Sequence, residues 1–144
     1  MKIVIDSNRA IAAMIKESTT REILLDKTFE FFAPEYIKEE IEKYEEEIMQ
    51  KASLEKEEFA ILLSLIFEHI TIIPQGEYHY FVEELKNKIS DLKDVAYLAV
   101  CLSIKADGIW THDLHFQEQK RCRIYTNVDL LRLRGKAELD SDKK

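Results

Sequence analysis

Ile3-Val4-Ile5-Asp6-Ser7-Asn8 is a short run of three β-branched apolar residues that gives way at once to polar ones. β-branched apolar residues favour strands, and Asp, Ser and Asn favour the turn or helix start that follows a strand. An apolar run without polar alternation is typical of a strand that is covered on both faces. The stretch therefore predicts a buried strand that ends directly at a carboxylate, Asp6.

Apolar runs of strand length alternate with segments of helical periodicity along the rest of the chain. Further strands are predicted at residues 29–33, 70–73, 108–111 and 124–126. Helices are predicted at residues 9–16, 18–27, 34–51, 53–67, 78–88, 91–105 and 127–133. Strands that alternate with helices imply a parallel sheet with helices on both faces. The predicted fold class is α/β, a three-layer α/β/α, Rossmann-like arrangement around an open, parallel, five-stranded sheet.

The length of the chain, 144 residues, fits one domain with a core of its own. Apolar residues make up 46% of the chain, which is typical of a globular protein. No linker or internal repeat interrupts the alternation of strands and helices. We therefore assign residues 1–133 to one domain and expect residues 134–144, which are mostly polar, to form a disordered tail.

Several features bear on where the protein acts. The longest nearly uncharged run, residues 95–104, is too short to span a bilayer. The first residues lead directly into the strand and show no signal-peptide pattern, so a cytoplasmic location is expected. Cys101 and Cys122 form neither a C-x-x-C pair nor a zinc-ligand spacing, and reduced thiols are expected.

The charge balance narrows the class of partner. A formal net charge of −7 argues against non-specific coating of duplex DNA. It does not exclude a nuclease, because bound metal ions reverse the sign of the local charge. Charged residues make up 34% of the chain, and there are only three Asn and four Gln, a balance similar to that of proteins from thermophiles.

Two acidic residues follow predicted strands that should be neighbours. Asp6 directly follows the first strand, and Asp113 follows the fourth strand after one intervening residue. In a sheet of order 3-2-1-4-5 these strands lie side by side where the strand order reverses. Ligands of open α/β sheets bind outside the carboxyl ends of the strands at this point. Both carboxylates should therefore reach the same crevice.

Two further acids lie on helices that should begin at the same crevice. Asp94 is in the first turn of a helix whose body, residues 95–104, is almost entirely apolar and must be buried. The helix dipole favours an ionised carboxylate at that position, which is the form that binds a hard divalent cation. Glu40 lies about six residues into the helix that begins at Pro34. This helix follows the second strand, which lies beside the first, so its early turns should also face the crevice.

Each acid also has a purely structural interpretation. Asp6 could cap the first helix, and Asp113 could be a turn residue. Asp91 and Asp94 could be a helix cap and a first-turn partner of the helix dipole. Glu40 could be one solvated acid among many in its helix. The convergence of the four acids on one crevice favours the functional interpretation over these alternatives.

Four segments resemble the motifs of the PIN-domain family, in particular its VapC-like and archaeal-type nucleases. Residues 3–8 resemble the first motif, an apolar strand that ends in Asp-x-Asn. Residues 34–41 resemble the second, a Pro and then a Glu followed by an aliphatic residue, and residues 91–100 resemble the third. Residues 108–113 resemble the fourth, an apolar strand that ends in Thr-x-Asp. The resemblance covers residues 2–133 and implies the PIN fold.

The resemblance also implies a set of site residues. The implied catalytic and metal-binding acids are Asp6, Glu40, Asp94 and Asp113. Asn8 and Thr111 would support these acids by hydrogen bonds.

The sequence departs from the family pattern at three places. Arg9 puts a long cation where many relatives have an apolar residue. Glu39 and Glu40 are adjacent, and Glu40 is preferred only because the aliphatic Ile41 follows it. Asp91 would be a fifth acid at the rim that reaches the metal through water.

The family activity is hydrolysis of phosphodiester bonds, usually in RNA. Mg²⁺ or Mn²⁺ suits carboxylate and water ligands and would activate the attacking water. Side chains near the third and fourth motifs would contact the substrate, namely Lys93, His112, His115 and Arg121. The H-x-x-H spacing of His112 and His115 could also indicate zinc, an interpretation that their position after a strand disfavours.

The resemblance leaves more than one biological role open. The leading hypothesis is a metal-dependent nuclease of single-stranded RNA, with the toxin of a toxin–antitoxin pair as its setting and an antitoxin protein as partner. A catalytically silent PIN fold that binds RNA or protein is the alternative, and a phosphatase of the Asp-x-Asp type is disfavoured by Asn8. A homodimer is expected because two apolar sets exceed what one face of a small sheet covers, namely Phe59, Leu63 and Phe67, and Tyr78, Phe81 and Leu85.

Overall fold

The computed structural model describes residues 1–89 and 91–142 of the chain. Its strands are β1 (Lys2–Ile5), β2 (Glu30–Pro34), β3 (Ile70–Ile73), β4 (Gly108–Trp110) and β5 (Ile124–Tyr125). Its helices are α1 (Ser7–Ile15), α2 (Thr19–Leu25), α3 (Tyr36–Lys43), α4 (Glu45–Ala52), α5 (Lys56–Phe67), α6 (Gln75–Leu85), α7 (Leu92–Ser103), the 3₁₀ helix η1 (Leu114–Glu118) and α8 (Asn127–Asp142).

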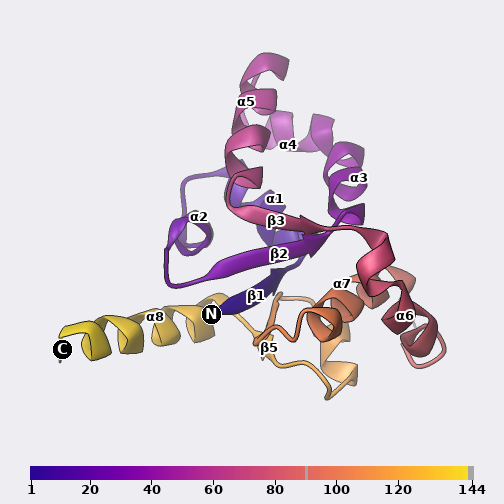
Figure 1. The fold of residues 1–144 in the computed structure, drawn as a ribbon. Helices are drawn as coiled ribbons and strands as arrows, with labels where there is room; N and C mark the ends of the chain where they lie inside the picture. Colours follow the sequence, from indigo (N-terminus) through magenta and orange to yellow (C-terminus); the bar gives the residue numbers. More distant parts are fainter. Residues whose placement is uncertain (90, 143–144) are drawn as a thin grey trace.

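The strands form one five-stranded sheet in the order β3-β2-β1-β4-β5 (Figure 1). All neighbouring strands pair in parallel, and in the centre Val4 of β1 pairs with Phe32 of β2 and Ile109 of β4. The α/β fold class, the number of strands and their order are therefore confirmed. The strand order reverses between β1 and β4, so the carboxyl ends of these two strands form the predicted crevice.

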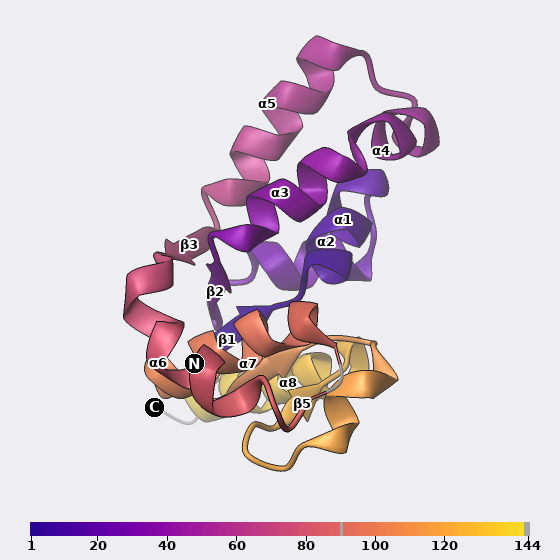
Figure 2. The same ribbon diagram turned by 90° about the vertical axis from the view of Figure 1, so that its right-hand side faces the viewer.

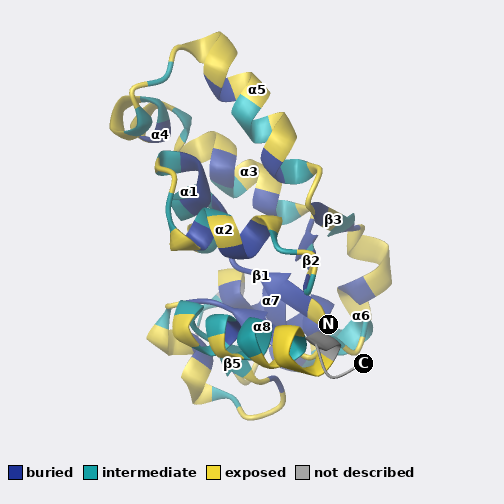
Figure 3. Cartoon of the chain, turned by 90° about the vertical axis from the view of Figure 1, so that its left-hand side faces the viewer, coloured by how far each residue is buried: buried dark blue, intermediate teal, exposed yellow. Residues whose placement is uncertain are grey.

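Helices cover both faces of the sheet (Figure 2). Ile3 and Ile5 of β1 pack with α1 and α2 in one core cluster, whereas Val4 packs with α6 and α7 in the other. This division follows from the alternation of side chains along a strand. All three side chains are fully buried, which explains why the run Ile3-Val4-Ile5 has no polar residue. Figure 3 shows β1 in the dark blue of buried residues.

The helix predicted over residues 34–51 is two helices in the structure. Pro34 ends β2, α3 begins at Tyr36, and α4 begins after a break at Tyr44, where φ is −105° and ψ is 14°. Ile41 of α3 and Ile48 of α4 both join the core that contains α1.

The last helix is longer than predicted. The sequence predicts its end near Leu133, before Gly135, but α8 continues to Asp142. The prediction of a disordered tail is therefore wrong for residues 134–142, and residues 143–144 lie outside the described residues. Near the middle of α8, Arg134 Nε lies 3.7 Å from Asp26 Oδ2, next to α2. The assignment of residues 1–133 as the functional domain stays a prediction.

The apolar sets that suggested a dimer belong to the interior. Phe59, Tyr78 and Leu85 are buried, and the remaining members of the sets, Leu63, Phe67 and Phe81, are partly buried against the core clusters. The argument for a homodimer from these residues is therefore wrong. Cys101 and Cys122 are both buried and free. Within the described residues, none of the helices has the length and apolarity needed to cross a membrane.

Candidate metal centre

Four elements bring acidic side chains to the carboxyl ends of β1 and β4. Asp6 follows β1, Asp113 follows β4, Glu40 lies in α3, and Asp94 lies in the first turn of α7. Burial is the main cause that raises the pKa of Asp6, and the charges of Glu40 and Asp113 add to it. Burial and then the charge of Asp91 raise the pKa of Asp94, and the charges of Asp113 and Asp6 add to the rise. The four acids that the sequence predicts are therefore neighbours in space.

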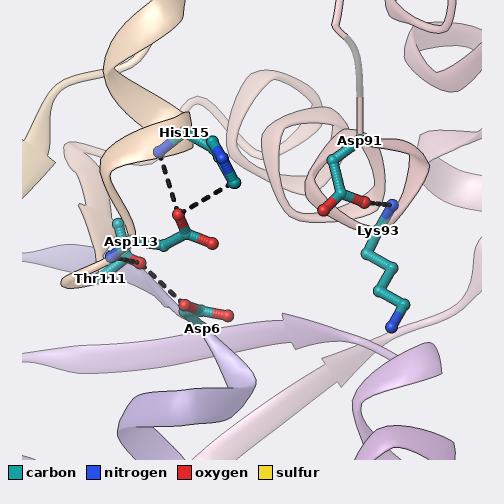
Figure 4. Close-up of polar contacts among 6 residues, drawn as sticks. All are labelled: Asp6, Asp91, Lys93, Thr111, Asp113 and His115. Atoms are coloured by element: carbon teal, nitrogen blue, oxygen red, sulfur yellow. Dashed lines mark hydrogen bonds and ion pairs between the residues drawn. The ribbon is translucent and has the colours of Figure 1, made fainter.

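Asp6 is held by Thr111 across the sheet. Its carboxylate is 5% exposed, and Oδ2 accepts a hydrogen bond of 2.8 Å from Thr111 Oγ1 (Figure 4). The same hydroxyl oxygen accepts a hydrogen bond of 3.0 Å from the backbone N–H of Asp113. One buried threonine at the end of β4 therefore fixes both Asp6 and the backbone that carries Asp113.

Glu40 is held by two hydroxyl groups that the sequence analysis did not identify. Oε2 accepts a hydrogen bond of 3.0 Å from Ser7 Oγ, and Oε1 accepts one of 2.6 Å from the phenol of Tyr97. Tyr97 is 1% exposed and lies three residues after Asp94, on the same side of α7. A lone hydroxyl at that spacing in an otherwise apolar helix was the signal that could have revealed it.

The adjacent acids Glu39 and Glu40 have different surroundings. Glu39 is exposed and lines a groove of about 660 Å³ between α3, α6 and α7, with Lys38 and Lys93 among its other lining residues. Glu40 contacts Ser7 and Tyr97 and lies close to Asp6. The geometry thus associates Glu40, rather than Glu39, with the acidic cluster.

Asp94 is buried without a full set of partners. Its side chain is 6% exposed, and Oδ2 has no hydrogen-bond partner among residues 1–89 and 91–142. A buried carboxylate oxygen without a partner is costly, because it has lost its hydration and gained nothing in return. A bound cation would supply the missing partner.

Burial and mutual repulsion both disfavour the ionised forms of these acids. Desolvation is the main cause that raises the pKa of Asp6 to about 6, and the hydrogen bond from Thr111 opposes part of this rise. Desolvation, followed by the charge of Asp91, raises the pKa of Asp94 to about 7. A divalent cation would reverse this balance, because it attracts the ionised carboxylates that now repel each other.

The donor set fits a hard divalent cation. Mg²⁺ and Mn²⁺ take carboxylate and water oxygens, and a cluster of carboxylates with an unpartnered buried oxygen offers such ligands. Asp91 and Asp113 also cap helices. Asp91 caps α7 by accepting a hydrogen bond from the backbone N–H of Lys93, and Asp113 caps η1 by accepting one from the backbone N–H of His115. The structural interpretation of these two acids therefore holds alongside the functional one.

Some predicted site residues lie apart from the acids or are committed elsewhere. The Asn8 side chain is exposed and lines a different groove with Tyr44 and Lys51, so only the backbone N–H of Asn8 acts on Asp6. Arg121 pairs with Glu84 at 2.9 Å. The structure therefore does not bring these two side chains to the four acids, and their supporting and substrate-binding roles stay predictions.

The basic residues nearest the acids are Arg9, Lys93 and the two histidines. Arg9 is partly buried, and it lies close enough to Asp6 for the two charges to interact. Its Nε has no hydrogen-bond partner within the part of the chain that the structure describes. His112 Nε2 accepts a hydrogen bond of 3.1 Å from the backbone N–H of Asn127, and burial lowers the pKa of this histidine. His115 Nδ1 lies 3.3 Å from Asp113 Oδ1.

Comparison with known proteins gives the family. A family model described as PIN domain matches residues 4–123, a span that includes all four acids. The chain belongs to the PIN-domain family. No curated protein matches this PIN domain significantly.

A solved structure has the same fold as this PIN domain. It is a chain of the crystal structure of VapBC2 from Rickettsia felis bound to a DNA fragment from their promoter. The TM-score is 0.65 at 17% sequence identity, over 88% of this chain and 98% of that chain. At this identity the likeness establishes the fold of the PIN domain and no more.

Proposed function

We propose that the protein is a divalent-metal-dependent nuclease that hydrolyses phosphodiester bonds in single-stranded RNA. The observation that carries the proposal is the convergence of Asp6, Glu40, Asp94 and Asp113 from four elements, with a buried Asp94 oxygen left without a partner. Membership of the PIN-domain family supports a nuclease, because proteins of this family generally are nucleases. RNA substrates would also place the activity in the cytoplasm.

Asp6, Glu40, Asp94 and Asp113 would hold Mg²⁺ or Mn²⁺. When bound, such an ion lowers the pKa of its water and neutralises charge on the phosphate. The surrounding hydroxyls have the task of holding the carboxylates in place: Thr111 orients Asp6, and Ser7 and Tyr97 orient Glu40. Such preorganisation limits the movement that metal binding requires.

The grooves on either side of the acids suggest a path for an extended strand of RNA. Lys93 and Glu39, next to Asp94 and Glu40, line the groove between α3, α6 and α7. His112 and Asp113 line a second groove of about 310 Å³. A single strand that crosses from one groove to the other would pass the acids. Lys93, His112 and His115 are the side chains that we propose contact its phosphates.

We further propose the biological setting of a toxin that is inhibited by a separate antitoxin protein. The support is the likeness in fold to a chain of the VapBC2 complex. A homodimer is part of this proposal. The exposed apolar side chains that could form it are Ile61 and Leu65 of α5, which are 63% and 50% exposed.

A catalytically silent PIN domain that binds RNA or protein is the alternative. The buried acids argue against it. Ionised Asp6 and Asp94 are costly in this environment, as their raised pKa values of about 6 and about 7 show. A binding module without a metal has no physical reason to keep these costly groups together.

Cleavage of single-stranded RNA in the presence of Mn²⁺, Mg²⁺ or EDTA tests the proposal. We expect cleavage with metal and none with EDTA. Asp6→Asn and Asp94→Asn should each abolish cleavage and leave the circular dichroism spectrum unchanged. Glu30→Gln is the matched control, because Glu30 is an exposed acid at the opposite end of the sheet. Wild-type rates in either aspartate variant would remove that residue from the site, and binding of RNA without any cleavage would favour the silent module.

A further inference from the structure

An open groove lies between β5 and α8, at the edge of the sheet beyond β4. Its volume is about 260 Å³, and α8 packs against β5 along it (Figure 3). We call it the β5–α8 groove, and its polar and aromatic lining residues are Arg123, Tyr125, Asp129, Arg132 and Lys136. None of the residues assigned to the metal centre lines this groove, so it is a separate feature of the molecule.

Cations dominate the β5–α8 groove. Arg123, Arg132 and Lys136 are exposed, and none of them forms an ion pair with another described residue of the chain. The acid of the lining, Asp129, is already engaged. Its Oδ2 accepts hydrogen bonds of 2.8 Å from the backbone N–H of Thr126 and of 3.0 Å from the hydroxyl of the same residue. The three cations are therefore available to an external anion.

This excess of cations is local, because the formal net charge of the chain is −7. The groove between α3, α6 and α7 is lined by three glutamates and two lysines. The groove beside Asp113 has neither lysine nor arginine in its lining. In the metal-free protein, a polyanion should therefore be attracted more strongly to the β5–α8 groove than to either groove next to the acids.

An aromatic ring lies among these cations. Tyr125 is half-buried, and its ring lies against Gly108 of β4, where a side chain would clash with it. An aromatic ring beside cations is typical of surfaces that bind single-stranded nucleic acid, because the ring stacks on a base while the cations hold phosphates. The bases of a duplex are stacked on one another and offer no face to such a ring. The lining therefore favours a single strand over a duplex.

The β5–α8 groove adjoins the groove beside Asp113, since Ile124 of β5 lines both. β5 is the neighbour of β4, and β4 is the neighbour of β1, so the two grooves follow each other outward from Asp6. A spacing of about 4.8 Å between neighbouring strands places β5 roughly 10 Å from β1. A single strand of RNA that lies at the acids would thus reach the β5–α8 groove within a few nucleotides.

We propose that the β5–α8 groove is an exosite for single-stranded RNA, in which Arg123, Arg132 and Lys136 hold phosphates and Tyr125 stacks on a base. The exosite takes no part in the chemistry at the acids. It holds a long strand next to them and so lowers the KM for long RNA. Cleavage of the bound strand rests on the proposed nuclease function, but the binding itself does not.

Fluorescence anisotropy of a labelled oligouridine in a metal chelator measures this binding without cleavage. Arg132→Ala/Lys136→Ala should weaken binding at least about tenfold. It should also reduce the slope of log affinity against log salt concentration by about 1.4, because each phosphate contact to a single strand contributes about 0.7. Both residues are exposed on α8, and alanine is a good helix former.

Lys51→Ala/Lys56→Ala is the matched control for this double variant. It also removes two exposed cations, at the end of α4 and the start of α5, and it leaves the β5–α8 groove intact. This control should bind oligouridine with the wild-type affinity and salt dependence.

Two measurements test the role of the aromatic ring. Photochemical cross-linking of the wild type to oligouridine that carries 5-iodouridine, mapped by mass spectrometry, should label Tyr125. Tyr125→Phe keeps the ring and should bind like the wild type, whereas Tyr125→Leu should weaken binding about fivefold or more without a change in the salt slope. If circular dichroism shows that Tyr125→Leu is unfolded, the cross-link in the wild type decides.

Steady-state cleavage in Mn²⁺ connects the exosite with the proposed function. Arg132→Ala/Lys136→Ala should raise the KM for oligouridine at least about fivefold and leave kcat unchanged. Cleavage of a uridine dinucleotide should not change, because this substrate is too short to reach from the acids to the groove.

The outcomes separate the exosite from the nuclease. Failure of the wild type to bind oligouridine, wild-type affinity in Arg132→Ala/Lys136→Ala, or cross-links only outside the β5–α8 groove would overturn the exosite. Equal affinity for duplex DNA and oligouridine would overturn the choice of a single strand. In each case, Mn²⁺-dependent cleavage by the wild type leaves the nuclease intact. Binding that depends on the groove, in a protein that cleaves no RNA, supports the exosite and rejects the nuclease.

Discussion

At the scale of single residues, the candidate site consists of carboxylates that are held in place by hydroxyl groups. Thr111 holds Asp6, whereas Ser7 and Tyr97 hold Glu40. The hydroxyls donate to the ionised carboxylates and so offset part of the cost of their burial. They leave the repulsion between the carboxylates in place, and a cation would relieve this repulsion.

The pair Glu39 and Glu40 gives a matched test of this arrangement. Glu40→Gln should weaken Mn²⁺ binding by at least about tenfold, because the substitution removes a charge next to Asp6. Glu39→Gln should change the Mn²⁺ affinity less than about twofold, because Glu39 is exposed in the neighbouring groove. Isothermal titration calorimetry of both variants measures the difference. A larger loss of Mn²⁺ affinity in Glu39→Gln than in Glu40→Gln would show that Glu39, and not Glu40, belongs to the metal site.

The pKa values of Asp6 and Asp94 predict how the stability of the metal-free protein depends on pH. Both are raised from 3.8, to about 6 and about 7, so the folded state holds these protons more tightly than the unfolded chain does. Their contribution to the free energy of unfolding is complete below the unfolded pKa and is lost as pH rises through the folded pKa values. The melting temperature in a metal chelator should therefore fall between pH 5 and pH 8.

Asp94→Asn should reduce that fall and should raise the melting temperature at pH 8, because Asn cannot ionise. Calorimetric melts of both proteins at pH 5 and pH 8 provide the measurement. Added Mn²⁺ should raise the melting temperature of the wild type much more than that of the variant, since the ion binds the folded site. A lower melting temperature of Asp94→Asn at pH 8 would show that ionised Asp94 does not destabilise the fold.

At the scale of elements, the pairing of β4 and β5 depends on a glycine. A Cβ atom on Gly108 would clash with Tyr125 Cε2 and would lie 2.7 Å from the backbone oxygen of Arg123. The second contact is with backbone that accepts a hydrogen bond from Ile109, so it cannot move without breaking the ladder. The close approach of β5 to β4 thus requires a residue without a side chain at position 108.

Gly108→Ala should destabilise the protein by about 1–3 kcal/mol, the usual range for forcing extra volume into a packed region. Gly135→Ala in α8 is the control. Its Cβ would meet nothing within 4 Å, and alanine should stabilise the helix by up to about 1 kcal/mol. Urea unfolding of both variants measures the two free energies. Equal stabilities of Gly108→Ala and the wild type would show that β5 can shift away without cost.

At the scale of the whole molecule, α5 carries apolar side chains that neither core cluster covers. Ile61 and Leu65 of α5 are 63% and 50% exposed, and they line a groove with Leu62 and Leu54. Exposed apolar side chains that gather on one helix are typical of an interaction surface. We therefore base the expectation of a homodimer on this exposed face of α5, and not on the apolar sets that the structure places in the interior.

We predict a homodimer that forms through this face. Light scattering should give a mass of about twice 17.0 kDa, and Leu65→Glu should shift the mass toward that of one chain. Leu139→Glu, on the exposed side of α8, should leave the mass unchanged. A concentration-independent mass near 17.0 kDa for the wild type would contradict the dimer.

The sequence by itself determined the fold class, the strand order and the identity of the clustered acids. Ile3-Val4-Ile5 could be interpreted from local pattern because a fully buried strand excludes polar residues from both faces. Asp6 and Asp113 could be brought together because parallel strands end at one edge of the sheet. These two inferences need only periodicity, composition and general rules of topology, whereas the choice of Glu40 over Glu39 came from the resemblance to the PIN-domain family.

Tertiary structure alone decided the details of packing and of hydrogen bonding. Local propensity indicated neither the break at Tyr44 nor the continuation of α8 past Gly135. The roles of Ser7 and Tyr97, and the approach of His115 to Asp91, arise between residues that are distant in the chain. Such contacts depend on side-chain directions in the folded molecule, which one sequence does not specify.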